Sequence, residues 1–231
     1  MAERNLSRIL CVSDSFGLPR PGVSYRTTWI ALLKERFPDK DFIGLFRRLG
    51  NTDMLSTTSY GEYLHWYDPD AVVIQLGICD CSPRYVPTNS KIYKILGALP
   101  KTLSTPVWRM VKLRGRRPGC RDVPPERYRR NLSAYVTECR KRGVKKVILV
   151  KIGIPTAKMV ASNPMILGSI AEYNAIIDDL AAIEKGYVAV CDPLSEGDPS
   201  VYTEDGYHPN PQGHSLIARE IAKAIECSRD R

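Results

Sequence analysis

The chain lacks any long hydrophobic run. No stretch of about 18 uncharged apolar residues occurs, so we expect no membrane-spanning helix. The apolar stretch Ile9-Leu10-Cys11-Val12 is too short for the core of a signal peptide and favours a strand. Internal repeats and low-complexity tracts are also absent. With 231 residues and 43% apolar content, the chain is expected to form a single globular domain over residues 1–231.

The cysteines lack the spacing of a disulfide framework or a zinc site. There are seven, an odd number, which fits reduced thiols and predicts a cytoplasmic protein. Histidine is scarce, with only His65, His208 and His214. The last two are separated by five residues, a spacing that matches no established ligand pair. We therefore expect neither a metal nor another cofactor.

Acidic residues are missing from residues 81–121, which contain ten basic side chains. This number exceeds the net charge of +9, so one segment accounts for the whole basic excess. Five prolines in the same stretch are expected to interrupt any long helix. We predict an insertion at about 82–121 that covers the edge of the site, with short helical pieces at 92–99 and 107–113. The basic residues are Arg84, Lys91, Lys94, Lys101, Arg109, Lys112, Arg114, Arg116, Arg117 and Arg121.

Three interpretations of this basic segment stay open. It can be a solvated, positively charged lid, or it can bind an anionic substrate such as an acidic polysaccharide, a nucleotide-sugar or a phosphate-linked acyl carrier. It can also adhere to an anionic membrane, because Tyr93, Trp108, Met110 and Val111 lie among the cations, as interfacial helices require. Nucleic acid is the least favoured partner, since no recognised motif accompanies the charge.

Short apolar runs alternate with helical patterns along the chain. The runs at 8–13, 42–46, 71–76, 146–152 and 187–191 do not alternate with polar residues, which is typical of parallel strands buried on both faces. Apolar residues at helical spacing predict helices between these runs. The last helix is expected to have Asn210 as N-cap and Pro211 in its first turn. The pattern predicts a three-layer α/β/α sandwich.

Polar residues follow four of the five predicted strands. Ser15 follows the first, Gly50-Asn51 the second, residues 77–80 the third, and the stretch 205–208 comes after the fifth. The carboxyl ends of parallel strands share one edge of the sheet, where such proteins bind their ligands. We therefore expect these groups to converge on one site.

The residues at that edge include all parts of a serine nucleophile system. The Ser15 hydroxyl is weakly nucleophilic until a base removes its proton. His208 suits that role because its ordinary pKa lies near neutrality. Asp205, three residues earlier, can orient the imidazole and stabilise its charged form. Ser15, Asp205 and His208 are the predicted catalytic residues, and His214 is expected to be structural.

These residues resemble the conserved blocks of the SGNH (GDSL-like) hydrolase superfamily. Its Gly-Asp-Ser-Leu block is similar to Ser13-Asp14-Ser15-Phe16, its glycine block to Gly50, its Gly-x-Asn-Asp block to Gly77-Ile78-Cys79-Asp80, and its Asp-x-x-His block to Asp205-Gly206-Tyr207-His208. The resemblance leaves out only residues 82–121. It implies the SGNH hydrolase fold, with a flavodoxin-like five-stranded parallel sheet.

Two residues depart from the family pattern. Ser13 replaces a glycine, and Cys79 replaces the asparagine whose amide would donate to the oxyanion. A thiol is a weak donor on a shorter side chain, and as a nucleophile in place of Ser15 it is the less favoured reading. The resemblance implies an oxyanion hole from the backbone N–H groups of Ser15 and Gly50, with Cys79 in the position of the third member.

Other residues in the matched blocks are expected to contact substrate. These are Asp14, which can also serve as a hydrogen-bonding scaffold, together with Asn51, Asp80 and Tyr207.

The resemblance implies a serine-dependent acyl-ester hydrolase that removes small O-acyl groups, above all acetyl, from a carbohydrate or related metabolite. An acyltransferase acting on a polysaccharide or glycan would use the same residues. Cys79 also leaves open a catalytically weakened module that binds an anionic glycan or a membrane surface. A phospholipase or lysophospholipase working at a membrane is a further alternative.

Overall fold

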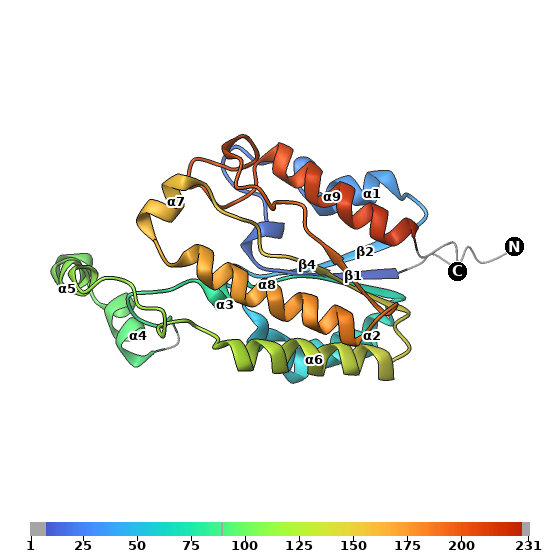
Figure 1. The fold of residues 1–231 in the computed structure, drawn as a ribbon, viewed down its shortest axis with the longest axis horizontal. Helices are drawn as coiled ribbons and strands as arrows, with labels where there is room; N and C mark the ends of the chain where they lie inside the picture. Colours follow the sequence, from blue (N-terminus) through green and yellow to red (C-terminus); the bar gives the residue numbers. More distant parts are fainter. Residues whose placement is uncertain (1–7, 89, 228–231) are drawn as a thin grey trace, which may run out of the picture.

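A five-stranded parallel sheet forms the centre of the molecule (Figure 1). The structure, a computed structural model, describes residues 8–88 and 90–227. The strand order is β2-β1-β3-β4-β5, and all four strand pairs are parallel. The strands are β1 (Arg8–Ser13), β2 (Asp41–Phe46), β3 (Ala71–Gln75), β4 (Lys146–Val150) and β5 (Val188–Cys191).

Helices cover both faces of this sheet, as Figure 1 shows. Neighbouring side chains of a strand point to opposite faces, so Leu10 and Val12 pack with α6 and α8 while Ile9 and Cys11 pack with α1 and α9. The predicted three-layer α/β/α sandwich is confirmed. The helices are α1 (Trp29–Arg36), α2 (Thr58–Tyr67), α3 (Ile78–Cys81), α4 (Lys91–Ala98), α5 (Lys101–Leu113), α6 (Pro125–Lys141), α7 (Ala157–Ser162), α8 (Ile166–Ile183) and α9 (Pro211–Glu226), with single-turn 3₁₀ segments η1 (Ser15–Gly17), η2 (Tyr25–Thr27), η3 (Thr52–Ser56) and η4 (Pro199–Val201).

The five predicted strands all form, with bounds that differ by at most two residues at either end. The last helix also begins as expected: the Asn210 side chain accepts hydrogen bonds from the N–H groups of Gln212 and Gly213, and Pro211 is the first helical residue. This cap holds the start of α9 just after the segment that carries Asp205 and His208.

The insertion differs from its prediction at Pro106. We expected the prolines to limit the second helical piece to 107–113, but α5 begins at Lys101 and includes Pro106. A proline inside a helix removes one backbone hydrogen bond and clashes with the preceding turn. Pro106 is the sixth residue of α5, so only the first turn precedes it, and there the helix is exposed on most sides. The second helical piece is therefore longer than predicted, whereas the first, α4, has the predicted length and begins one residue earlier.

No helix within residues 8–88 and 90–227 combines the length and the apolar character needed to cross a membrane.

Candidate active site

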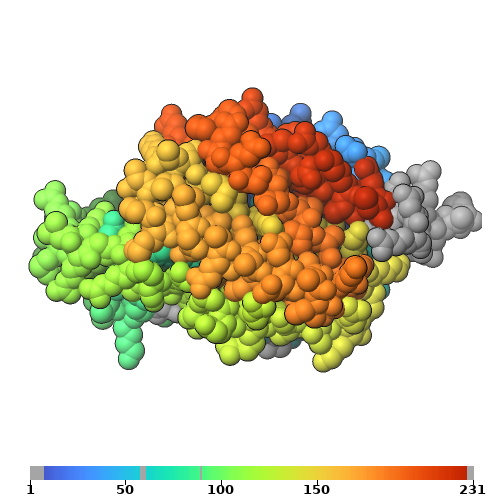
Figure 2. All heavy atoms as spheres, viewed as in Figure 1, coloured from blue at the N-terminus to red at the C-terminus, as the bar shows by residue number. Residues whose placement is uncertain are grey.

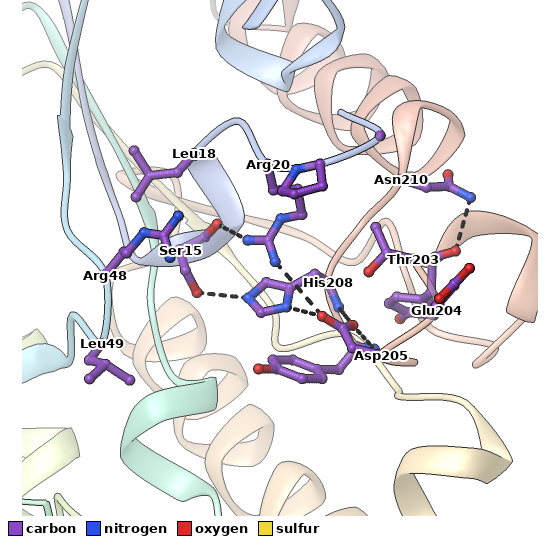
Figure 3. Close-up of a pocket in the computed structure, with 14 residues that line it drawn as sticks. Ser15, Leu18, Arg20, Arg48, Leu49, Thr203, Glu204, Asp205, His208 and Asn210 are labelled. Carbon is purple, nitrogen blue, oxygen red and sulfur yellow. Dashed lines mark hydrogen bonds and ion pairs between the residues drawn. The ribbon is translucent and has the colours of Figure 1, made fainter. Parts of the chain in front are cut away.

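An open cleft of about 1030 Å³ lies at the carboxyl edge of the sheet. Three stretches of chain line it: the turn after β1, the loop after β2, and the loop between η4 and α9. Ser15 comes from the first and His208 from the third, although they are 193 residues apart in sequence. Figure 3 shows both side chains pointing toward one another. The lining residues are Ser15, Leu18, Arg20, Pro21, Gly22, Arg48, Leu49, Tyr202, Thr203, Glu204, Asp205, Tyr207, His208 and Asn210.

Ser15 is held by the tight turn that ends β1. The Asp14 carboxylate accepts a hydrogen bond of 2.8 Å from the Phe16 N–H and so caps the 3₁₀ turn η1. Gly17 closes this turn against the Phe46 ring, where an added Cβ would lie 2.9 Å from ring carbons. The turn places the Ser15 hydroxyl at the cleft wall.

The three predicted catalytic side chains form a continuous chain of hydrogen bonds. Ser15 Oγ lies 2.9 Å from His208 Nε2, and His208 Nδ1 lies 2.6 Å from Asp205 Oδ2. A carboxylate can only accept, so the imidazole proton is on Nδ1, and Nε2 is free to accept the serine proton. The geometry is that of a nucleophile, a base and an orienting acid.

Asp205 and the His208 ring are fixed by their neighbours. Asp205 Oδ1 accepts from the backbone N–H groups of Tyr207 and His208, both at 3.0 Å. The ring of His208 contacts those of Tyr207, at a centroid distance of 4.1 Å, and Phe16, at 5.3 Å. Gly206 lies between Asp205 and Tyr207 with φ of +82°, a conformation that other residues rarely adopt. The turn thereby brings the aspartate and the histidine to one side.

These contacts shift the pKa of each partner. Burial lowers the pKa of His208 below its ordinary 6.5, the hydrogen bond to Asp205 opposes this, and the charge of Arg20 adds to the lowering. Burial disfavours the ionised form of Asp205, but the N–H groups of His208 and Tyr207 and the His208 ring outweigh it and hold its pKa below the ordinary value. At neutral pH the site therefore contains a neutral imidazole and a carboxylate, the states that general-base catalysis requires.

Arg20 was not anticipated from the sequence. One of its guanidinium nitrogens donates to the Ser15 carbonyl oxygen at 2.6 Å, and another lies 3.8 Å from Asp205 Oδ2. Arg20 thus links the nucleophile turn to the acid of the distant loop, as the dashed lines of Figure 3 show. Arg48, also missed, lines the cleft beside Ser15 and forms no ion pair within the described residues. Arg20 and Arg48 lie in loops and belong to no recognisable sequence motif, so nothing in the sequence singled them out.

The expected oxyanion donors differ in availability. Within the described chain no acceptor takes the Ser15 N–H, whereas the Gly50 N–H donates to the Arg47 carbonyl oxygen at 3.0 Å. The Gly50 N–H can therefore reach an oxyanion only as a bifurcated donor that also serves the Arg47 carbonyl oxygen. Cys79 is buried, and burial raises the pKa of its thiol well above the ordinary value, so it is not a thiolate nucleophile at neutral pH.

Asp14 and Asp80 correct our expectation of substrate contact. Both are fully buried, and both carboxylates bind the scaffold: Asp14 the Phe16 N–H, and Asp80 Oδ1 the N–H and hydroxyl of Thr52. Burial raises the pKa of each to about 7, partly opposed by these hydrogen bonds. They support the loops after β1 and β2 and do not reach the cleft.

The other two expected substrate contacts are placed differently. Asn51 does not line the cleft, and its side chain caps η3 by accepting from the Asp53 N–H at 3.2 Å. Tyr207 does line the cleft, half-buried against His208. In the described residues, no group of three or more His, Cys, Asp or Glu side chains could hold a metal ion.

His214 lies away from the chemistry. It is fully buried at the start of α9. Its Nδ1 accepts a hydrogen bond of 3.2 Å from the backbone N–H of Trp29 at the start of α1. Burial, with the nearby charges of Arg20 and His208, lowers its pKa to about 4. A neutral His214 therefore joins the two helices on one face of the sheet.

We expect His214→Leu to destabilise the protein by about 1–3 kcal/mol, because it leaves the buried Trp29 N–H without an acceptor. The folded pKa of His214 is below the ordinary 6.5, so its contribution is present above pH 6.5 and is lost as the pH falls toward about 4. Urea unfolding across this range should show that pH-dependent component in the wild type and not in the variant. An unchanged kcat would be expected for the variant; a loss of kcat without loss of stability would contradict the structural role.

Comparisons with known proteins agree with this geometry. The model of the GDSL-like lipase/acylhydrolase family matches residues 14–216. A lipase/acylhydrolase from Enterococcus faecalis has a similar fold, with a TM-score of 0.64 at 17% identity over 96% of this chain and 97% of that one. An acetylxylan esterase from Geobacillus stearothermophilus gives 0.61 at 17% identity over 95% and 94%. An acetyl esterase, solved as a serine-to-alanine mutant with acetate, gives 0.64 at 15% identity over 97% and 99%.

No curated protein sequence matches the chain. The family match covers most of the chain, including the segments that carry Ser15, Asp205 and His208. The chain therefore belongs to the GDSL-like lipase/acylhydrolase family and is an acyl hydrolase.

Proposed function

We propose that Ser15, His208 and Asp205 hydrolyse small O-acyl esters, chiefly acetyl esters of a carbohydrate or related metabolite. The observation that carries this proposal is the hydrogen-bonded chain from Ser15 Oγ through the His208 ring to Asp205. At neutral pH the lowered pKa values of His208 and Asp205 favour the neutral imidazole and the carboxylate that the reaction needs. Arg20 acts as a positioning residue that holds the two ends of this chain together.

The reaction proceeds in two steps. Ser15 Oγ attacks the acyl carbonyl carbon while His208 Nε2 takes the hydroxyl proton, and the tetrahedral oxyanion accepts from the Ser15 N–H and from a shared Gly50 N–H. His208 then gives its proton to the leaving alcohol oxygen, and the acyl–oxygen bond to the alcohol breaks. In the second step water attacks the acyl-serine with His208 as base, which releases the acid and restores Ser15.

The shape and charge of the cleft support a carbohydrate as the alcohol part. The cleft is open, so a bulky alcohol can extend from it, and Arg48, Thr203 and Glu204 supply polar side chains along its wall. Two enzymes of similar fold are named for acetyl and acetylxylan ester hydrolysis. The charge of Arg48, which no acidic side chain of the described residues pairs, favours a substrate with an anionic group. Access of water to the open cleft favours hydrolysis over acyl transfer to a second alcohol.

We also propose a cytoplasmic location. All seven cysteines are free, and five of them are buried. Free thiols persist in the reducing environment of the cytoplasm.

Labelling with a fluorophosphonate tests the proposal directly, because only an activated serine reacts. We expect wild-type protein to be labelled at Ser15, and we expect His208→Ala to lose the label while remaining folded. Hydrolysis should then fall steeply along a series of sugar esters from acetyl to longer acyl chains. A folded wild-type protein that takes no label would instead indicate a non-catalytic module, and a preference for long chains would contradict the small-acyl assignment.

A further inference from the structure

Helices α4 and α5 form a hairpin that projects from the body of the molecule. In Figure 1 they lie beyond the carboxyl edge of the sheet, and in Figure 2 the green atoms of residues 101–113 form one end of the molecule. The chain enters this hairpin from β3 and α3 and returns to α6, so it emerges from the same edge as the catalytic cleft. We refer to residues 90–115 as the basic hairpin.

The basic hairpin carries positive charge without compensation. It contains six cationic side chains and no acidic one, and none of the six forms an ion pair within the described residues. The cations are Lys91, Lys94, Lys101, Arg109, Lys112 and Arg114. Such a cluster is attracted to an anionic surface, and the attraction is screened by salt.

Each helix of the hairpin also exposes an apolar stripe. On α5, Leu103, Met110 and Leu113 occupy one sector of the helix, and Leu113 is 87% exposed. On α4, Ile92 and Ile95 occupy a similar sector, with exposed fractions of 57% and 61%. The cations of each helix lie in the sector beside the stripe, which is the arrangement of helices that lie in a membrane interface.

The exposed stripes are not needed to hold the hairpin together. The two helices contact one another through Tyr93 and Trp108, whose rings meet edge to face at 5.5 Å, and each helix has a buried residue of its own, Leu96 on α4 and Ser104 on α5. The apolar side chains on the outer sectors therefore remain more than half exposed to solvent.

The base of the hairpin is firmly tied to the body. Asp122 forms an ion pair of 2.7 Å with Arg84 and accepts hydrogen bonds from the N–H and hydroxyl of Thr88. The segments on either side of the hairpin, 82–88 and 116–122, form its neck. Backbone hydrogen bonds across this neck join Arg84 to Cys120 and to Arg117. The neck fixes the hairpin as a projection from the cleft edge.

We propose that the basic hairpin docks the enzyme on an anionic lipid bilayer, with the apolar stripes inserted among the acyl chains and the cations on the lipid headgroups. A soluble polyanion accounts for the charge but gives no reason to expose five large aliphatic side chains beside it. A bilayer interface uses both features. Docking through this hairpin brings the cleft edge of the sheet to the membrane surface.

Co-sedimentation of the full chain with vesicles tests this proposal without reference to hydrolysis. We expect binding to phosphatidylcholine vesicles that contain phosphatidylglycerol, little binding to phosphatidylcholine alone, and release as ionic strength rises. The triple variant Leu103→Ser, Met110→Ser, Leu113→Ser and the triple variant Lys94→Glu, Lys101→Glu, Lys112→Glu should each lower the partition coefficient about 10-fold or more. Circular dichroism and thermal unfolding establish that both variants are folded.

Matched controls change similar side chains elsewhere on the surface. Ile183→Ser removes an aliphatic side chain that is 73% exposed on α8, and Arg130→Glu with Lys141→Glu reverses two cations on α6. Both controls should bind vesicles as the wild type does. Equal binding to neutral vesicles, equal effects of the controls, or full retention of binding by the apolar variant would overturn the proposal. If only the charge variant loses binding, and it loses a soluble acidic polysaccharide equally, the hairpin docks a polyanion and not a bilayer.

Discussion

Ser15→Ala is expected to reduce kcat for an aryl acetate by at least about 10⁴-fold while leaving the fold intact. The variant lacks the only hydroxyl oxygen that contacts His208 Nε2 in the described site. Its stability should change little, because the Ser15 side chain makes no other hydrogen bond there and is only half-buried. Steady-state turnover and thermal unfolding, measured on the same preparation, check both parts.

The control for this variant is Ser56→Ala. Ser56 is an exposed serine whose hydroxyl donates to the Asp53 carbonyl oxygen, away from the cleft. It should retain wild-type turnover. Turnover retained by folded Ser15→Ala would remove Ser15 from the reaction and direct attention to another nucleophile.

Asp205→Asn is expected to lower kcat by on the order of 10⁴ without displacing the loop. The amide oxygen can still accept from the Tyr207 and His208 N–H groups. The amide nitrogen, however, donates to His208 Nδ1 and places the ring proton on Nε2, where the base must be free. The loss should therefore appear in kcat with a similar free energy of unfolding.

The pH profile distinguishes this effect from a general loss of structure. In the wild type, kcat/KM should rise with pH through a pKa below 6.5, because only neutral His208 acts as base and its folded pKa is lowered. Asp205 raises the pKa of His208, so its replacement should move this acidic limb to still lower pH. Asp198→Asn, which alters an exposed aspartate that caps η4, should leave both the limb and kcat unchanged. A limb that moves upward in Asp205→Asn would contradict the orienting role.

The sheet could be predicted because its central strands, β1, β3 and β4, are buried on both faces. A run such as Leu10-Cys11-Val12 has no exposed positions, so its continuous apolar character is sufficient to identify it. The length of α5 could not be predicted. A proline disfavours the interior of a helix, but this preference does not determine how many helical residues precede Pro106. That outcome depends on packing against α4, which the sequence pattern does not specify.

Some features of the candidate site could likewise be predicted from the sequence, and others could not. Asp205 and His208 are close in sequence, and the topology of a parallel sheet brings them to Ser15, so their convergence could be predicted. The burial of Asp14 and Asp80 and the bond from the Gly50 N–H to Arg47 depend on how the loops after β1 and β2 fold back on the scaffold. Arg20 illustrates the same limit, since its contact to Asp205 joins two loops from opposite ends of the chain.

The separation of 193 residues between Ser15 and His208 has a consequence during synthesis on the ribosome. Ser15 is made 193 residues before His208, and the Trp29–His214 hydrogen bond that joins α1 to α9 likewise links two segments made far apart in time. A nascent chain can assemble β1 to β5 before the segment with His208 has emerged. The Ser15 hydroxyl therefore has no imidazole partner until the segment that carries His208 has been made and has folded against the turn after β1.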